Sequence, residues 1–92
     1  MEILDTIEIE VCRMYNLDRT EIELRTKKRT VVEARKVFVT VAIRSALSRT
    51  SITSRLNISK GRITQILKET HKESRLDRVC QRVVDLVNKS PK

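Results

Sequence analysis

A segment in the second half of the chain carries polar side chains that suit contacts with the edges of DNA bases. Lys60 and Arg62 can donate hydrogen bonds to guanine O6 and N7, and the amide of Gln65 can pair with an adenine edge. Thr64 can contact a phosphate or a thymine methyl group. Gly61 lowers helix propensity by about 1 kcal/mol relative to alanine, and close approach to a DNA backbone is one reason to keep it. These five residues are the candidate base readers.

The elements that must position these residues have the pattern of a helix-turn-helix, with expected helices over 51–56 and 60–71. Asn57 tolerates the left-handed conformation that ends the first helix, and Ser59 can cap the second. The angle between the helices is expected to be locked by the apolar residues Ile52, Leu56, Ile63 and Ile66. An ordinary helical hairpin with a polar outer face has the same pattern.

The charge of the chain is unevenly distributed. Residues 1–23 carry seven acidic and two basic side chains, residues 24–72 two acidic and thirteen basic, and residues 73–92 three acidic and five basic. A polyanion would therefore be drawn to the middle segment, although a basic face kept for solubility gives the same composition. The expected contacts with the DNA backbone or minor groove are Arg25, Lys27, Lys28, Arg29, Thr30, Arg49, Ser51, Arg55, Ser59 and Lys68.

The rest of the 92-residue chain predicts further helices around one core. Leu4, Ile7, Val11 and Met14 recur at spacings of three and four residues, which predicts a helix over 1–16 with an apolar stripe. Further helices are expected over 20–25, 31–47 and 76–88, and a basic loop over 25–30. The prediction is a single all-α domain, a compact bundle of about six helices built on the long helix 31–47.

This order of elements resembles the C-terminal DNA-binding domain of the bacterial replication initiator DnaA, of the Trp-repressor-like helix-turn-helix class. The resemblance rests on the opening helix, the basic loop Arg25–Arg29, the run Val31-Val32-Glu33-Ala34-Arg35 and the helix-turn-helix. It implies that Lys27 occupies the position of an arginine that enters the minor groove. The family's Asp-His-Thr-Thr signature is replaced by Gly61-Arg62-Ile63-Thr64, so recognition of the family's DNA box is not implied.

Other classes of function are disfavoured by the residue inventory. With one histidine, His71, and no evident catalytic pairing, we expect no enzyme activity, metal site or cofactor. No signal peptide or membrane span is evident, so a cytoplasmic protein with two reduced, buried cysteines, Cys12 and Cys80, is expected.

The hypothesis is double-stranded-DNA binding that serves transcription regulation or replication control, by a homodimer or as part of a larger protein. The alternative is a protein-interaction module with a vestigial helix-turn-helix, in which the acidic first helix (Glu2, Asp5, Glu8, Glu10) binds a basic partner.

Overall fold

The computed structural model describes residues 3–23 and 28–88, and within these ranges it contains six α-helices and no strand. The helices are α1 (Ile3–Tyr15), α2 (Arg19–Glu23), α3 (Arg29–Arg44), α4 (Arg49–Leu56), α5 (Lys60–Lys72) and α6 (Ser74–Asn88). The prediction of an all-α bundle is therefore confirmed.

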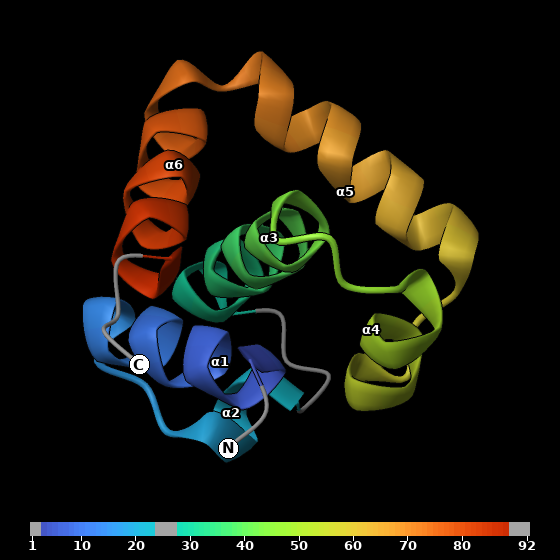
Figure 1. Cartoon of the computed structure of the whole chain (residues 1–92), viewed down its shortest axis with the longest axis horizontal. Coiled ribbons are helices and arrows are strands. Elements are labelled where there is room, and N and C mark those ends of the chain that lie inside the picture. Colours follow the sequence, from blue (N-terminus) through green and yellow to red (C-terminus); the bar gives the residue numbers. More distant parts are fainter. Residues whose placement is uncertain (1–2, 24–27, 89–92) are drawn as a thin grey trace.

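Helix α3 forms the centre of the bundle. Figure 1 looks almost along its axis, with α5 and α6 on one side and α1 and α2 on the other. Every residue from Val37 to Ala42 is buried, including Phe38, because neighbouring helices cover α3 on several faces. The β-branched run that resembles a strand in sequence is thus helical, since its apolar residues find partners all round the helix.

Two helices end in the same backbone motif, which fixes where the chain turns back. Asn16 after α1 and Ala46 after α3 adopt positive φ values of 55° and 67°. The next residue then donates its N–H to a carbonyl five residues back, from Leu17 to the carbonyl of Cys12 and from Leu47 to the carbonyl of Ala42. Because of this motif α3 ends at Arg44, so the prediction of a helix continuing to 47 was wrong.

The starts of two helices also differ from the sequence prediction. Helix α3 begins at Arg29, so Arg29 and Thr30 lie in its first turn instead of in a loop. Helix α4 begins at Arg49 because the Ser48 hydroxyl accepts a hydrogen bond from the Ser51 N–H at 3.1 Å. The helix predicted over 51–56 therefore begins two residues earlier, because Ser48 already satisfies this N–H at the point where the chain leaves α3.

The outer helices pack on α3 through apolar stripes. Leu4, Ile7 and Val11 of α1 are buried as expected, but Met14 is 40% exposed, and Tyr15 packs against the core from the last turn instead. Cys12 and Cys80 are free and buried, and burial raises the pKa of both thiols to about 11. These thiols are therefore protonated and unreactive at neutral pH.

Candidate functional site

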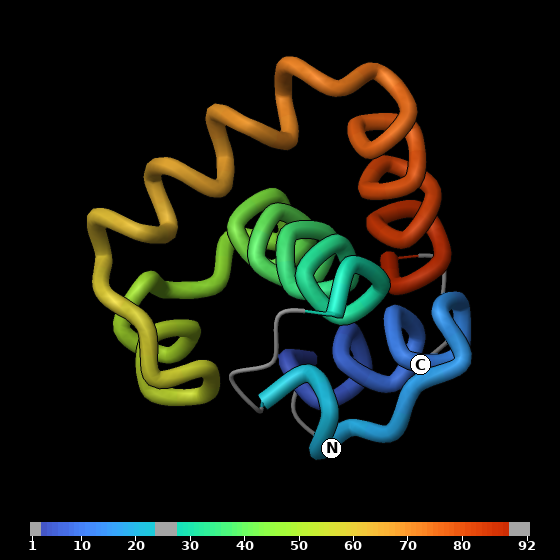
Figure 2. Tube along the Cα trace, turned by 180° about the vertical axis from the view of Figure 1, so that it is seen from behind, coloured from blue at the N-terminus to red at the C-terminus, as the bar shows by residue number. Residues whose placement is uncertain are grey.

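Helices α4 and α5 are joined by a three-residue turn that has the features expected of a helix-turn-helix. Asn57 is left-handed with φ 56° and ψ 49°, and the Ser59 hydroxyl caps α5 by accepting from the Arg62 N–H at 3.1 Å. The half-buried Ile58 packs behind the turn. Figure 2 shows α4 at the left edge of the molecule, with α5 running from it along the upper side, past the central helix.

The outward face of α5 carries the candidate base readers. Its inner stripe is buried at Ile63, Ile66 and Thr70, which fixes the rotation of the helix. The stripe on the opposite side holds Gly61, Gln65 and Lys68, at spacings of four and three residues, and all three are exposed. If α5 lies along this stripe in a groove of DNA, the residue at the centre of the contact is Gln65. Its amide can both donate and accept hydrogen bonds.

Two other candidate readers lie on the flanks of this stripe, each fixed by a neighbour. Thr64 accepts a hydrogen bond from Arg49 of α4 at 3.2 Å and donates to the carbonyl of Lys60 at 3.4 Å. Arg62 donates to the Gln65 amide oxygen at 3.1 Å. The flank of Thr64 thus faces α4, while Arg62 orients the amide of the central Gln65.

Gly61 has no structural requirement for glycine. Its φ is not positive, and a Cβ built at this position meets only the Ser59 hydroxyl oxygen, at 3.9 Å, which is ordinary van der Waals contact. Because the fold tolerates a side chain here, the propensity cost of glycine in the first turn of α5 has no explanation within the domain.

The other expected backbone contacts are placed as follows. Arg49, Ser51, Ser59 and Lys68 are exposed on α4, the turn and α5, and Lys28, Arg29 and Thr30 are exposed at the start of α3. Arg25 and Lys27 lie outside the described residues. Val32 and Lys36 of α3 line a hollow of about 80 Å³ together with Ile58 and Arg62. The start of α3 therefore lies beside the turn between α4 and α5.

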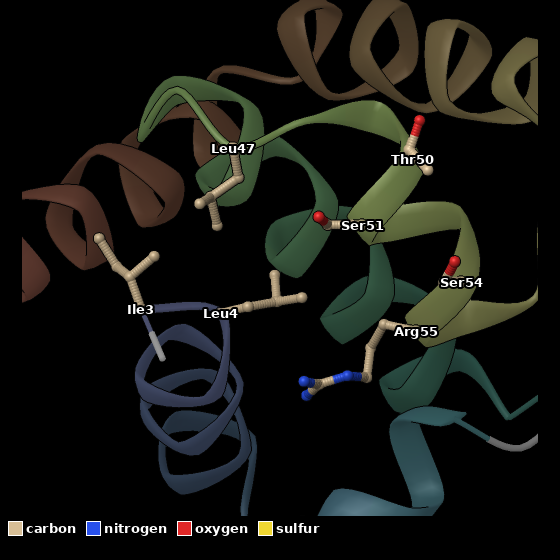
Figure 3. Close-up of a pocket in the computed structure, with 7 residues that line it drawn as sticks. All are labelled: Ile3, Leu4, Leu47, Thr50, Ser51, Ser54 and Arg55. Atoms are coloured by element: carbon tan, nitrogen blue, oxygen red, sulfur yellow. The ribbon is translucent and has the colours of Figure 1, made fainter. Parts of the chain in front are cut away.

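Arg55 has a different role from the one expected. Its guanidinium extends from α4 toward α1, as Figure 3 shows, and its side chain is only 20% exposed. It bonds Glu8 at 2.9 Å and Asp5 at 2.9 Å, and Arg19 of α2 bonds the same two carboxylates at 2.8 Å each. We call these four residues the inner ion-pair cluster. Because its guanidinium is already paired with both carboxylates, we do not include Arg55 among the proposed DNA contacts.

The inner ion-pair cluster perturbs its two acids in opposite directions. Arg55 and Arg19 lower the pKa of Asp5, because both bond its ionised form. Burial raises the pKa of Glu8, whose side chain is fully inaccessible to solvent. The Arg19 guanidinium lowers this pKa, and the nearby carboxyl of Glu23 raises it. One oxygen of Glu8, Oε2, accepts no hydrogen bond among the described residues. The cluster therefore holds a buried charge at some cost.

Beside the cluster lies a hollow of about 430 Å³ between the start of α1 and α4. Ile3, Leu4 and Leu47 form its apolar side, and the hydroxyl groups of α4 line the other (Figure 3). Arg55 also borders this hollow, and its charge is already neutralised by Asp5 and Glu8.

The sequence analysis overlooked one property of this surface. No Asp or Glu occurs between Glu33 and Glu69, so α4 and the first two turns of α5 contain no acid of their own. Lys36, Arg44 and Arg55 inside this stretch pair with acids from outside it, namely Glu69, Asp77, Asp5 and Glu8. Among the described residues, Arg49, Lys60, Arg62 and Lys68 form no such ion pair. The acid-free stretch is visible in the sequence and was the available signal.

In comparisons with known proteins, no protein-family model, curated protein or solved structure matches the chain. The resemblance to the initiator domain stays a prediction from the residues. In the described ranges, no helix is long and apolar enough to cross a membrane. Residues 3–23 and 28–88 also contain no group of three or more His, Cys, Asp or Glu side chains that could hold a metal ion.

Proposed function

We propose that this chain binds double-stranded DNA, with α5 in the major groove and the start of α3 and the preceding basic segment on the backbone or minor groove. The observation that carries the proposal is the outward stripe of α5. Gln65 and Lys68 project from it in a stretch without acidic residues, behind a capped three-residue turn. Such a stripe offers donors to base edges and cations to phosphates over one helix face.

The proposed roles follow from position on α5. Gln65 reads an adenine edge at the centre of the groove, and Gly61 allows the backbone to approach closely. Arg62 and Lys60 donate to guanine from the first turn of α5, and Thr64 contacts a phosphate or a thymine methyl group. Lys68, Arg49, Ser51, Ser59 and the basic residues at 25–30 hold the phosphates. Transcription regulation and replication control both require such a binder.

The alternative of a protein-interaction module is less favoured, because the acids of α1 have partners inside the domain. Asp5 and Glu8 bond Arg19 and Arg55, and Glu10 lies 3.8 Å from Arg13. Glu2 is not among the described residues. Little uncompensated acidic surface is left on α1 to attract a basic partner.

The test begins with selection of bound sequences from a random duplex pool, followed by titration of the best duplex at several salt concentrations. Contact with about five to eight phosphates gives a log–log salt slope of about −4 to −7, at about −0.9 per phosphate. A slope near zero, or no measurable duplex binding, would rule out the proposal.

Single substitutions then separate base reading from charge. Gln65→Ala and Arg62→Ala are each expected to cost about 1–3 kcal/mol on the best site while non-specific binding remains. Because Arg62 bonds Gln65, the two losses should not add in a double-mutant cycle. Arg78→Ala removes an exposed charge from α6 and is the control, which should leave the preferred sequence unchanged.

A further inference from the structure

Two exposed apolar side chains lie together at the end of the molecule away from the turn between α4 and α5. Met14 is 40% exposed and Leu86 is 48% exposed, and both line a hollow of about 340 Å³ between the last turns of α1 and α6. Glu10, Arg13 and Arg82 complete this lining. In Figure 1 these helix ends lie at the left and α4 at the right. We call this feature the α1–α6 hollow.

We propose that the α1–α6 hollow binds the same hollow of a second copy of the chain. In a two-fold interface each contact occurs twice, so the surface must be complementary to itself. The rim of this hollow carries both signs, with Glu10 on α1 and Arg82 on α6. A two-fold axis that runs along the hollow, between the two helices, places α1 of each copy over α6 of the other. It brings Glu10 of each copy toward Arg82 of the other, and Met14 and Leu86 into one apolar centre.

The charges of the two helices favour the same pairing. Glu10 is the acid of α1 that lines the hollow, and Arg82 lines it from α6, whereas Asp5 and Glu8 pair with Arg19 and Arg55 nearer the start of α1. Placing α1 of one copy against α6 of the other therefore opposes the unlike charges of Glu10 and Arg82. The ion pair within α1 does not prevent this, because Glu10 lies 3.8 Å from Arg13 and the Arg13 side chain is 74% exposed.

The interface is expected to be weak and to leave the DNA-binding face free. Two apolar side chains per copy put the buried area at the low end for specific pairs, below about 1,200 Å². The dissociation constant should therefore be on the order of 0.1 mM or weaker. Helix α5 lies at the upper right in Figure 1, away from the last turns of α1 and α6 at the left, so pairing is expected to leave both copies able to bind a duplex.

Sedimentation equilibrium of the full chain without DNA tests the proposal. The wild-type mass should rise above that of one chain as the concentration approaches about 1 mM, and Leu86→Lys should weaken association at least tenfold. Ile3→Lys is the matched control, because Ile3 is similarly exposed at 38% but lies at the other end of α1, and it should leave association unchanged. A constant monomer mass, or an equal effect of both substitutions, would overturn the proposal.

A charge exchange tests that the partner is a second copy. Glu10→Arg and Arg82→Glu should each weaken association by about tenfold, because each places like charges together across the axis. The two substitutions combined in one chain should restore association, since the pairs re-form with exchanged signs. Circular dichroism checks that each variant is folded. Failure of the combined variant to recover would refute self-pairing, and the measurement does not depend on DNA binding.

Discussion

Replacing Arg55 by methionine isolates what the inner ion-pair cluster contributes to stability. The substitution keeps most of the aliphatic stem and removes only the guanidinium that bonds Glu8 and Asp5. Breaking a buried pair by removing one partner costs about 3–5 kcal/mol, because the other charge is left uncompensated. Since Arg19 still bonds Glu8 at 2.8 Å, we expect a smaller loss of about 2–3 kcal/mol at pH 7.

Denaturant unfolding followed by circular dichroism measures this loss in the free energy of unfolding. In thermal unfolding the same loss should lower Tm by about 10–15 °C. Burial already raises the pKa of Glu8, and loss of Arg55 should raise it further. A carboxyl whose folded-state pKa exceeds the unfolded value takes up its proton first in the folded chain. Lowering the pH from 7 to 5 should therefore shrink the difference from wild type.

Arg13→Ala is the matched control for this experiment, because it removes a loosely paired arginine whose side chain is 74% exposed. It should change stability by less than about 0.5 kcal/mol at either pH. A loss below about 0.5 kcal/mol for Arg55→Met at pH 7, or an equal loss at both pH values, would refute the argument that the cluster holds a buried charge.

Three further predictions concern the helix-turn-helix and the basic segment. Gly61→Ala should stabilise the fold by about 0.5–1 kcal/mol in chemical unfolding, yet weaken duplex binding at least fivefold; unchanged affinity would show that no close approach occurs. Asn57→Ala should cost about 1 kcal/mol more than Asn57→Gly, because φ is 56°, and equal costs would contradict this reason. Replacing Lys27, Lys28 and Arg29 together by alanine should make the salt slope of duplex binding shallower by about 2–3 units in a folded protein; an unchanged slope would exclude the basic segment from the interface.

The helices were predictable because their apolar residues recur at spacings that only a helix can place on one face. The long apolar run of α3 was ambiguous locally, and its length without Gly or Pro decided for a helix. Its end was not predictable. Alanine seldom adopts positive φ, so nothing in the sequence marks Ala46 as the residue that ends α3. The start of α4 was ambiguous because Ser48, Thr50 and Ser51 can all cap a helix.

The candidate site was predictable where it depends on local order along one helix. The exposed face of α5 follows from the spacing of Ile63 and Ile66, and the structure adds that Gln65 is central while Arg62 and Thr64 lie at the flanks. The ion pairs of Arg55 could not be predicted, because its partners lie 47 and more residues away in sequence. Only the packing of α4 on α2, which itself packs on α1, brings these charges together.

The inner ion-pair cluster also accounts for acidic residues near the start of the chain without invoking a basic partner protein. Because α4 and the first two turns of α5 contain no acid, the inward-facing Arg55 must be neutralised by carboxylates supplied from elsewhere. Asp5 and Glu8 supply them, whereas Lys60, Arg62 and Lys68 on the exposed side of α5 receive no such partner from the described residues. Within α4 and the first two turns of α5, the neutralised cation is thus the inward-facing one. Cations without carboxylate partners on the exposed side favour the attraction of a polyanion.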